Sequence, residues 1–213
     1  IFDCFQFFDE NMMLDLRLNI LNEYVHKFVI VENAFMHSGK KKDPVFEIKN
    51  FSKFKDKIIY ILVEKLPEGL YDTSKIKNMR EKGNRIIDNT LMVEHAQRNS
   101  ITKGLNDAEE NDLIIVSDVD EIPNLEENDL RESNKKITHF KQKMFYYKFN
   151  LKYGSVPWYG SRACRKKNLL SPQWLRDTKS RKYPLWRLDI SFSKAKYNSI
   201  DYIENGGWHF VNI

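Results

Sequence analysis

Three short, uninterrupted runs of apolar residues are the sequence feature that most constrains the fold. They cover residues 28–31, 58–63 and 113–116, and β-branched, aliphatic and aromatic side chains fill them. Such runs are typical of parallel strands that are buried on both faces of a sheet. Stretches with helical periodicity alternate with these runs. We therefore predict an α/β domain with a mostly parallel central sheet and helices on both faces.

Two stretches carry the apolar spacing of amphipathic helices. Residues 11–25 repeat leucine or valine at intervals of four, three and four residues, and Asn11 is available to cap the first turn. The second stretch is residues 83–105, where Glu94 stands four positions before Arg98 and predicts an ion pair within the helix. On one side of this second helix we expect Ile87, Leu91, Met92 and Ala96.

The composition fits one globular domain over residues 1–213. Hydrophobic residues make up 41% of the chain and aromatic residues 13%, which is enough to fill a sizeable core. The longest apolar run, residues 58–63, is much shorter than the roughly 20 residues that cross a bilayer, so we expect no membrane span in this stretch of chain and leave peripheral association open. The sequence starts at Ile1 without a basic and apolar leader, so a signal or anchor could have been removed. Localisation stays open between the cytoplasm, the membrane periphery and the Golgi lumen.

Charge and cysteine content exclude two classes of protein. Lys and Arg number 35 against 30 Asp and Glu, a formal net charge of +5, whereas a dedicated nucleic-acid binder concentrates positive charge. We therefore expect no nucleic-acid partner. Cys4 and Cys164 are too few for a four-thiolate metal site, and we expect two free, buried thiols.

The second half of the chain is rich in aromatic residues. Residues 138–152 alternate aromatic side chains with lysine, and residues 153–158 and 183–186 add rings beside glycine and proline. We expect a smaller antiparallel sheet with irregular strands there. Trp and Tyr beside a polar cleft suit stacking on sugar rings, although such rings more often fill the core. The best candidates for stacking are Trp158, Trp186 and Trp208.

The most informative motif is Asp118-Val119-Asp120, which follows the apolar run at 113–116 after one serine. Both carboxylates can reach one point above the sheet edge, where parallel sheets gather their ligands. Two unpaired carboxylates so close resist joint ionisation. A hard divalent cation such as Mg²⁺ or Mn²⁺ removes this conflict and bridges to phosphates. We therefore predict a metal site, the alternative being a turn with two solvated acids.

A histidine far along the chain is the candidate for a further ligand. His209 stands in Gly206-Gly207-Trp208-His209-Phe210, where the paired glycines let the backbone approach a ligand closely. Imidazole is a common metal ligand, but a lone histidine is often structural. Both roles stay open for His209.

Taken together, these residues resemble glycosyltransferase family 17. The aspartate motif, preceded by a helix with Ala96-Gln97-Arg98-Asn99, looks like the donor half of a GT-A glycosyltransferase. The family includes the β-1,4-mannosyl-glycoprotein 4-β-N-acetylglucosaminyltransferases that add bisecting N-acetylglucosamine. The segments that resemble it run in order along the chain: DCFQFFDE at 3–10, LRL at 16–18, FVIVE at 28–32, SGK at 38–40, SDVDEIP at 117–123 and GGWHF at 206–210.

The resemblance implies a GT-A-type single domain, with a donor-binding half at about 1–123 and an acceptor-side half at about 124–213. Asp118 and Asp120 would hold Mn²⁺, or Mg²⁺, against the diphosphate of a UDP-sugar, and His209 would complete the protein ligands of the ion. The reaction implied is the transfer of a sugar, N-acetylglucosamine by analogy, to a glycan or glycoconjugate acceptor with inversion of the anomeric centre.

The resemblance also implies residues beside the nucleotide. Glu32 and Asn33 would lie by it, near the loop that contains Ser38 and Gly39. Arg98 would approach the nucleotide or hold the aspartate loop. The alternative, that Arg98 pairs only within its own helix, stays open.

Inversion in one displacement requires a carboxylate base beside the acceptor hydroxyl. Glu204 is our choice because it adjoins the GGWHF segment, and the other acids considered are Asp177, Asp189, Asp201 and Glu121. Two departures from the family pattern concern the loop and the acceptor. Residues 40–44 are longer and more basic than expected, and the lysine-rich second half matches the animal enzymes poorly. The acceptor and the linkage formed are therefore left open.

Two other functions compete with this interpretation. Phosphatases of the haloacid dehalogenase type also place Asp-x-Asp after an aliphatic strand, with the first Asp as nucleophile, but they carry Thr or Val where this chain has Ile122. A catalytically silent domain could hold glycans or polyanions through its aromatic and basic residues. The presence of Asp118, Asp120 and His209 together argues against this second alternative.

Overall fold

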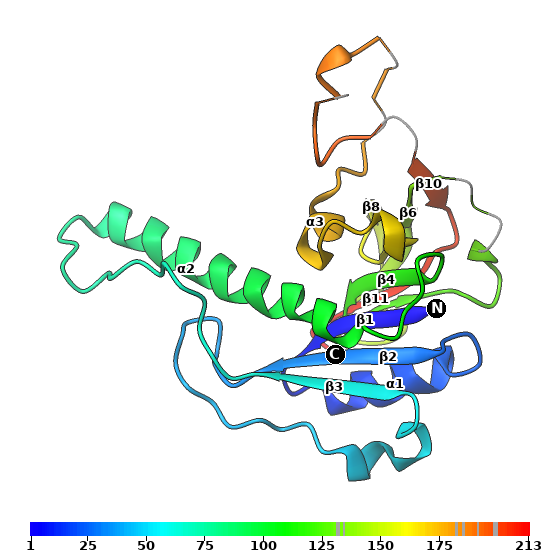
Figure 1. Ribbon diagram of the computed structural model, residues 1–213, viewed down its shortest axis with the longest axis horizontal. Helices are drawn as coiled ribbons and strands as arrows, with labels where there is room; N and C mark the ends of the chain where they lie inside the picture. Colours follow the sequence, from blue (N-terminus) through cyan, green and yellow to red (C-terminus); the bar gives the residue numbers. More distant parts are fainter. Residues whose placement is uncertain (131–132, 134, 182, 185, 191, 198–199) are drawn as a thin grey trace.

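The computed structural model describes residues 1–130, 133, 135–181, 183–184, 186–190, 192–197 and 200–213. These residues form a mixed α/β fold with two sheets (Figure 1). The strands of the larger sheet are β1 (Phe2–Phe7), β2 (Lys27–Asn33), β3 (Ile58–Val63), β4 (Leu113–Asp118), β6 (Ile137–Phe140), β9 (Arg162–Arg165) and β10 (Ile200–Ile203). Their order across the sheet is β10-β6-β9-β4-β1-β2-β3.

Most neighbouring strands of the larger sheet run parallel. β1 pairs in parallel with β2 and β4, β2 with β3, and β6 with β10, whereas β9 is antiparallel to β4 and β6. The three strands predicted from apolar runs are confirmed as parts of β2, β3 and β4. Burial on both faces is confirmed for β2 and β4 but wrong for β3, which is mostly half-buried because it lies at the sheet edge.

Helices cover both faces of the larger sheet, as predicted. On one face packs α1 (Asn11–Leu21), whose Leu14 shares a core with Phe5. The opposite face is covered by the 3₁₀ helix η2 (Ser100–Gly104) and by α3 (Pro172–Asp177). Ile101 of η2 and Leu175 of α3 share a second core with Val29. Three further 3₁₀ turns among the described residues are η1 (Ile48–Phe54), η4 (Lys166–Asn168) and η5 (Leu188–Ile190).

The first predicted helix is shorter than its apolar pattern. It ends at Leu21 rather than Val25, although Val25 is buried and its N–H donates to the Leu21 carbonyl. The prediction that Asn11 caps this helix is wrong, because Asn11 is its first helical residue and Glu10 holds the cap position. The Glu10 carboxylate instead accepts the backbone N–H groups of Phe8 and Asp9.

The second predicted helix is α2 (Met79–Asn99). It begins earlier than predicted because the Asn78 side chain caps it, and it passes into η2 at Ser100. The four apolar residues predicted for one side of this helix differ in burial: Ile87 is 59% exposed and Leu91 is also exposed, whereas Met92 and Ala96 are half-buried. The first part of α2 projects away from the larger sheet, so only its last turns can pack on it (Figure 1). The buried residues of α2 are Val93, Gln97 and Arg98.

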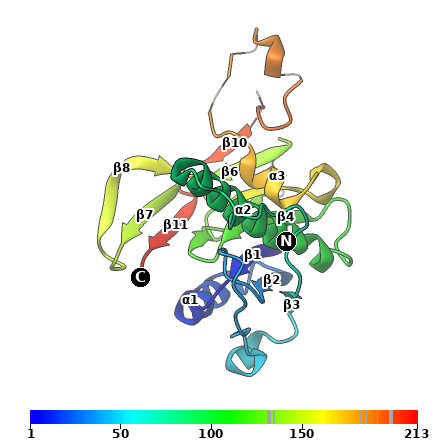
Figure 2. The ribbon, with the colours of Figure 1, turned by 90° about the vertical axis from the view of Figure 1, so that its left-hand side faces the viewer.

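The smaller sheet consists of β5 (Glu121–Pro123), β11 (Gly207–Val211), β7 (Gln142–Tyr146) and β8 (Lys152–Trp158), in this order. The prediction that it is antiparallel is confirmed for two of its three strand pairs, β11 with β5 and β7 with β8. It is wrong for β11 and β7, which run parallel because the chain between them crosses through the larger sheet. The smaller sheet extends to the side of the fold that carries α1 (Figure 2).

The remaining expectations concern thiols, membrane spans and one aromatic segment. Cys4 and Cys164 are free and buried, as predicted, and burial raises the pKa of Cys164 to about 12. Among the described residues no helix is both long enough and apolar enough to cross a membrane. Residue 185 of the aromatic segment 183–186 lies outside the described residues.

A buried histidine of β6 is expected to make stability depend on pH. His139 is fully buried, with Nε2 2.9 Å from the Thr178 hydroxyl, and burial, Arg162 and Arg176 lower its pKa to about 3. The unfolded chain therefore binds this proton below pH ~6.5 while the folded chain does not. The contribution of His139 to stability is fully present above pH ~6.5 and is lost as the pH falls towards 3. At pH ~4 the free energy of unfolding should be lower by about 3 kcal/mol. Urea unfolding of the wild type and His139→Gln across this window measures the difference, and parallel pH curves would contradict the prediction.

Candidate active site

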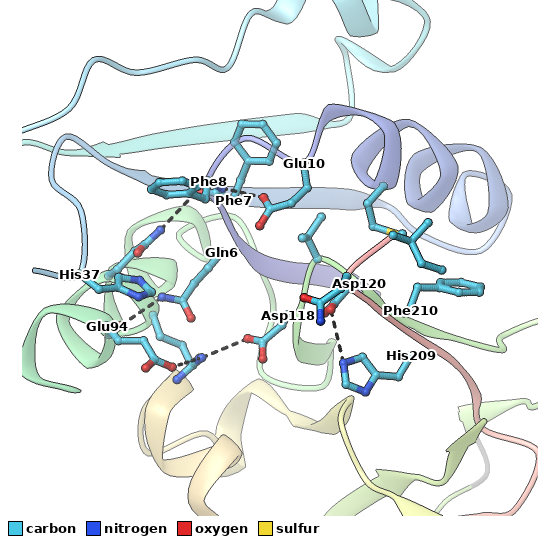
Figure 3. A pocket seen from close by; sticks show the side chains of 16 residues that line it. Gln6, Phe7, Phe8, Glu10, His37, Glu94, Asp118, Asp120, His209 and Phe210 are labelled. Carbon is cyan, nitrogen blue, oxygen red and sulfur yellow. Dashed lines mark hydrogen bonds and ion pairs between the residues drawn. The ribbon is translucent and has the colours of Figure 1, made fainter. Parts of the chain in front are cut away.

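A cavity of about 450 Å³ opens where the carboxyl ends of β1 and β4 meet (Figure 3). Its polar lining includes Gln6, Glu10, Glu94, Arg98, Asp118, Asp120 and His209. The cavity thus joins the end of β1, the last turns of α2, the β4–β5 turn and β11. Four of the residues predicted for the site are brought together here: Arg98, Asp118, Asp120 and His209.

Two arginines hold Asp118 at the end of β4. Its Oδ1 lies 3.1 Å from Nη2 of Arg98, and its Oδ2 lies 2.8 Å from Nη2 of Arg176, a residue of α3. Burial raises the pKa of the Asp118 carboxyl, but Arg176 and Arg98 together outweigh burial and hold it below the usual value. Arg98 also pairs with Glu94 at 2.8 Å, which confirms the predicted helix pair. The alternative in which Arg98 pairs only with Glu94 is wrong, because Arg98 also holds Asp118.

Asp120 faces His209 across the β4–β5 turn. Oδ2 of Asp120 and Nε2 of His209 are 3.4 Å apart. His209 is held in β11, where it pairs with Glu121 of β5, and its ring stacks on Trp158 with 4.8 Å between ring centroids. Its Nδ1 is buried and has no hydrogen-bond partner among the described residues. Pairing of the chain's last strand with β5 therefore brings His209 to the aspartate motif.

Glu121 fixes the turn from inside the protein. It is fully buried, and its carboxylate accepts the backbone N–H of Asp118 at 2.9 Å and the indole N–H of Trp158 at 2.8 Å. Arg176 neutralises it at 2.6 Å. From the sequence, Glu121 was a candidate only for the base and Arg176 was not a candidate, because no local pattern links α3 to the β4–β5 turn.

Arg17 of α1 holds the same turn from the other side. Its guanidinium is fully buried and donates to the backbone carbonyls of Asp118, Val119 and Glu121 at 3.0, 3.2 and 2.8 Å. It also pairs with the buried Asp3 of β1 at 2.6 Å. Asp3 and Arg17, which the sequence shows only as members of the segments 3–10 and 16–18, therefore hold the aspartate turn in place.

Four of the residues predicted beside the nucleotide, Glu32, Asn33, Ser38 and Gly39, are not among those that line this cavity. Glu32 is fully buried, and its oxygens accept hydrogen bonds from Lys42 at 2.5 Å, from Tyr60 at 2.8 Å and from the backbone of residues 45 and 46. Asn33 is buried and donates to Gln97 at 3.2 Å. Ser38 and Gly39 follow His37, which does line the cavity. The nucleotide contacts of these four residues stay a prediction.

The predicted base lies outside the cavity. Glu204 is exposed, pairs with Lys141 at 2.6 Å and borders a separate hollow beside β7 and β8. Its role as base stays a prediction, and the carboxylates that line the cavity besides the two aspartates are Glu10 and Glu94. Of the three tryptophans proposed for sugar stacking, Trp158 stacks on His209, Trp186 is exposed and Trp208 packs beside the core.

The side chains that could coordinate a divalent ion fit that role only in part. Asp120 and His209 line the cavity and offer an oxygen and a nitrogen, while both oxygens of Asp118 are paired with arginine. Within the part of the chain that the structure describes, no group of three or more Asp, Glu, His or Cys side chains could hold a metal ion as arranged. Each oxygen of Asp118 accepts one arginine hydrogen bond and keeps a further lone pair, so Asp118 can join such a set beside its arginine contacts.

The model of glycosyltransferase family 17 matches residues 1–171. The chain therefore belongs to glycosyltransferase family 17, and the protein is a glycosyltransferase. This confirms the resemblance and sets aside the phosphatase and the silent binding domain. No curated protein matches the chain. The matched region contains Arg98, Asp118, Asp120 and Glu121, whereas Arg176 and His209 lie beyond it.

Proposed function

We propose that this glycosyltransferase moves N-acetylglucosamine from a UDP-sugar to a glycan acceptor, with inversion and with the help of Mn²⁺ or Mg²⁺, in a domain of GT-A type. The observation that carries the proposal is the cavity at the ends of β1 and β4, which gathers Arg98, Asp118, Asp120 and His209. Its volume of about 450 Å³ lies in the range of small-molecule sites.

The charges around the cavity support a diphosphate ligand. Arg98 lines the cavity and is fixed by Asp118, and guanidinium groups bind phosphate oxygens well. Asp120 and His209 would hold the divalent ion, which when bound would neutralise charge on the departing diphosphate. Arg17 and Glu121 keep the backbone of the turn in place, so that Asp120 stays directed at the cavity.

Binding of UDP is expected to require the divalent ion, because Asp120 would otherwise face the diphosphate as a like charge. With Mn²⁺, Asp120→Ala should weaken UDP binding at least about tenfold. The control Glu109→Ala removes an exposed acid and should leave the affinity unchanged. Isothermal titration calorimetry measures both variants, and equal UDP affinity with and without chelator would falsify the prediction.

The sugar of the donor is assigned from the family resemblance alone. In a panel of nucleotide sugars, slow hydrolysis should be fastest with UDP-N-acetylglucosamine when Mn²⁺ is present. Release of the nucleoside diphosphate measures the rate without any acceptor. A preference for a GDP- or CMP-linked sugar would overturn the donor assignment while leaving the family assignment intact.

A further inference from the structure

The hairpin of β7 and β8 carries charge of one sign. Residues 138–153 contain Lys141, Lys143, Lys148 and Lys152 but no Asp or Glu. Lys141 pairs with Glu204, whereas the described residues offer no ion pair to the other three lysines. The basic hairpin, defined here as residues 141–153, is therefore a local excess of positive charge in a chain whose net charge is only +5.

The same hairpin exposes large apolar and aromatic side chains. Tyr147, Phe149, Leu151 and Tyr153 are between 47% and 66% exposed, and three of the four lie in the connection between the two strands. The backbone there folds back on the chain's last strand, since Tyr147 N–H donates to the Val211 carbonyl. Figure 2 shows β7 and β8 at the margin of the molecule, near the C-terminus. Side chains on this margin are free to meet a partner.

An apolar groove links the basic hairpin to the active-site cavity. It has a volume of about 320 Å³ and lies between α1 and the smaller sheet, lined by Leu16, Ile20, Phe145, Phe149, Trp208 and Phe210. Phe149 lies edge-on to Phe210, with 5.1 Å between ring centroids. Phe210 also lines the active-site cavity. The apolar groove and the active-site cavity therefore share Phe210 as part of their walls.

We propose that the basic hairpin and the apolar groove dock on the surface of an anionic lipid bilayer. Aromatic and aliphatic side chains flanked by lysine suit the boundary between headgroups and acyl chains, where the rings enter the apolar layer and the lysines meet anionic headgroups. Docking in this way would hold the sugar-transfer cavity at the membrane surface. The proposal does not depend on the identity of the donor or of the ion.

Charge favours a bilayer over a second copy of the chain. A two-fold symmetric dimer through this face would bring Lys143, Lys148 and Lys152 of each copy against the same lysines of the other. An anionic bilayer instead neutralises all of them. The exposed start of α2 is a weaker candidate for membrane contact, because Glu81 and Asp88 stand among its cations.

Co-sedimentation of the full chain with vesicles tests the proposal. We expect binding to vesicles of equimolar phosphatidylcholine and phosphatidylglycerol, weaker binding to phosphatidylcholine alone, and loss of binding at high salt. Phe149→Ser with Leu151→Ser, and separately Lys148→Glu with Lys152→Glu, should each lower the partition coefficient at least about tenfold. Thermal melting checks that each variant is folded.

Matched controls, called the α2 controls, come from α2 and from the loop that precedes it. Met79→Ser with Ile87→Ser, and Lys75→Glu with Lys77→Glu, change exposed residues and should leave vesicle binding within about twofold of the wild type. Wild-type binding by the folded hairpin variants, or an equal loss in the α2 controls, would overturn the proposal. The proposal would also be overturned if the wild type formed a dimer and did not bind vesicles, and if the hairpin variants dissociated that dimer. The assay needs no nucleotide sugar, so its failure is distinct from failure of the proposed sugar transfer.

Discussion

Replacing Arg17 by methionine is expected to lower the free energy of unfolding by about 3–5 kcal/mol. Arg17 and Asp3 are both fully buried, and two hydrogen bonds of 2.6 and 2.8 Å join them. Without the guanidinium, the Asp3 carboxylate would stay in the core with no cation to compensate it. Three backbone carbonyls of the aspartate turn would also lose their donor.

Urea unfolding at neutral pH measures this loss. The matched control is Arg187→Met, since Arg187 also pairs with an aspartate, Asp189 at 2.6 Å, but lies near the surface. Arg187→Met should lower the free energy of unfolding by less than about 1 kcal/mol. Adding Asp3→Asn to Arg17→Met should recover part of the stability, because it removes the uncompensated charge. Equal losses in the Arg17 and Arg187 variants would contradict a buried pair that organises the site.

The parts of the fold predicted correctly are those with a local signal. Apolar runs located β2, β3 and β4, and the motif after β4 located Asp118 and Asp120. β1 was not predicted as a strand, because Asp3 and Gln6 interrupt its apolar residues. Asp3 is tolerated in the core only because Arg17, one helix later, neutralises it. A local pattern shows each charge but not their pairing.

Periodicity also predicted a helix without predicting which part of it packs. The spacing of Ile87 and Leu91 is that of an apolar face, but both residues are exposed. Burial is instead decided at the other end of the helix, where Gln97 donates to the carbonyl of Val31 at 2.9 Å. Arg176 reaches Asp118 in the same manner, through tertiary packing of α3, so no sequence spacing could have indicated it.

The largest loss of activity that leaves the fold intact is expected from His209→Asn. His209 lines the cavity with its Nε2 3.4 Å from Asp120, but its backbone is held by pairing of β11 with β5 and β7, which does not depend on the side chain. Asparagine keeps polarity and approximate size while removing the imidazole nitrogen. If His209 serves the divalent ion, transfer should fall at least about 100-fold, because even residues that only support a metal ligand cost 10–100-fold when lost.

Sugar transfer, Mn²⁺-dependent UDP binding and thermal melting should be measured together on His209→Asn. A role at the ion leaves the melting transition ordinary and weakens UDP binding in Mn²⁺ more than in chelator. A structural role does the opposite, because the ring stacks on Trp158 and its loss would loosen the packing around Glu121. His26→Asn changes an exposed histidine and should match the wild type in all three measurements. Early melting of His209→Asn, with wild-type metal dependence in its folded fraction, would make His209 structural and require another partner for Asp120 at the ion.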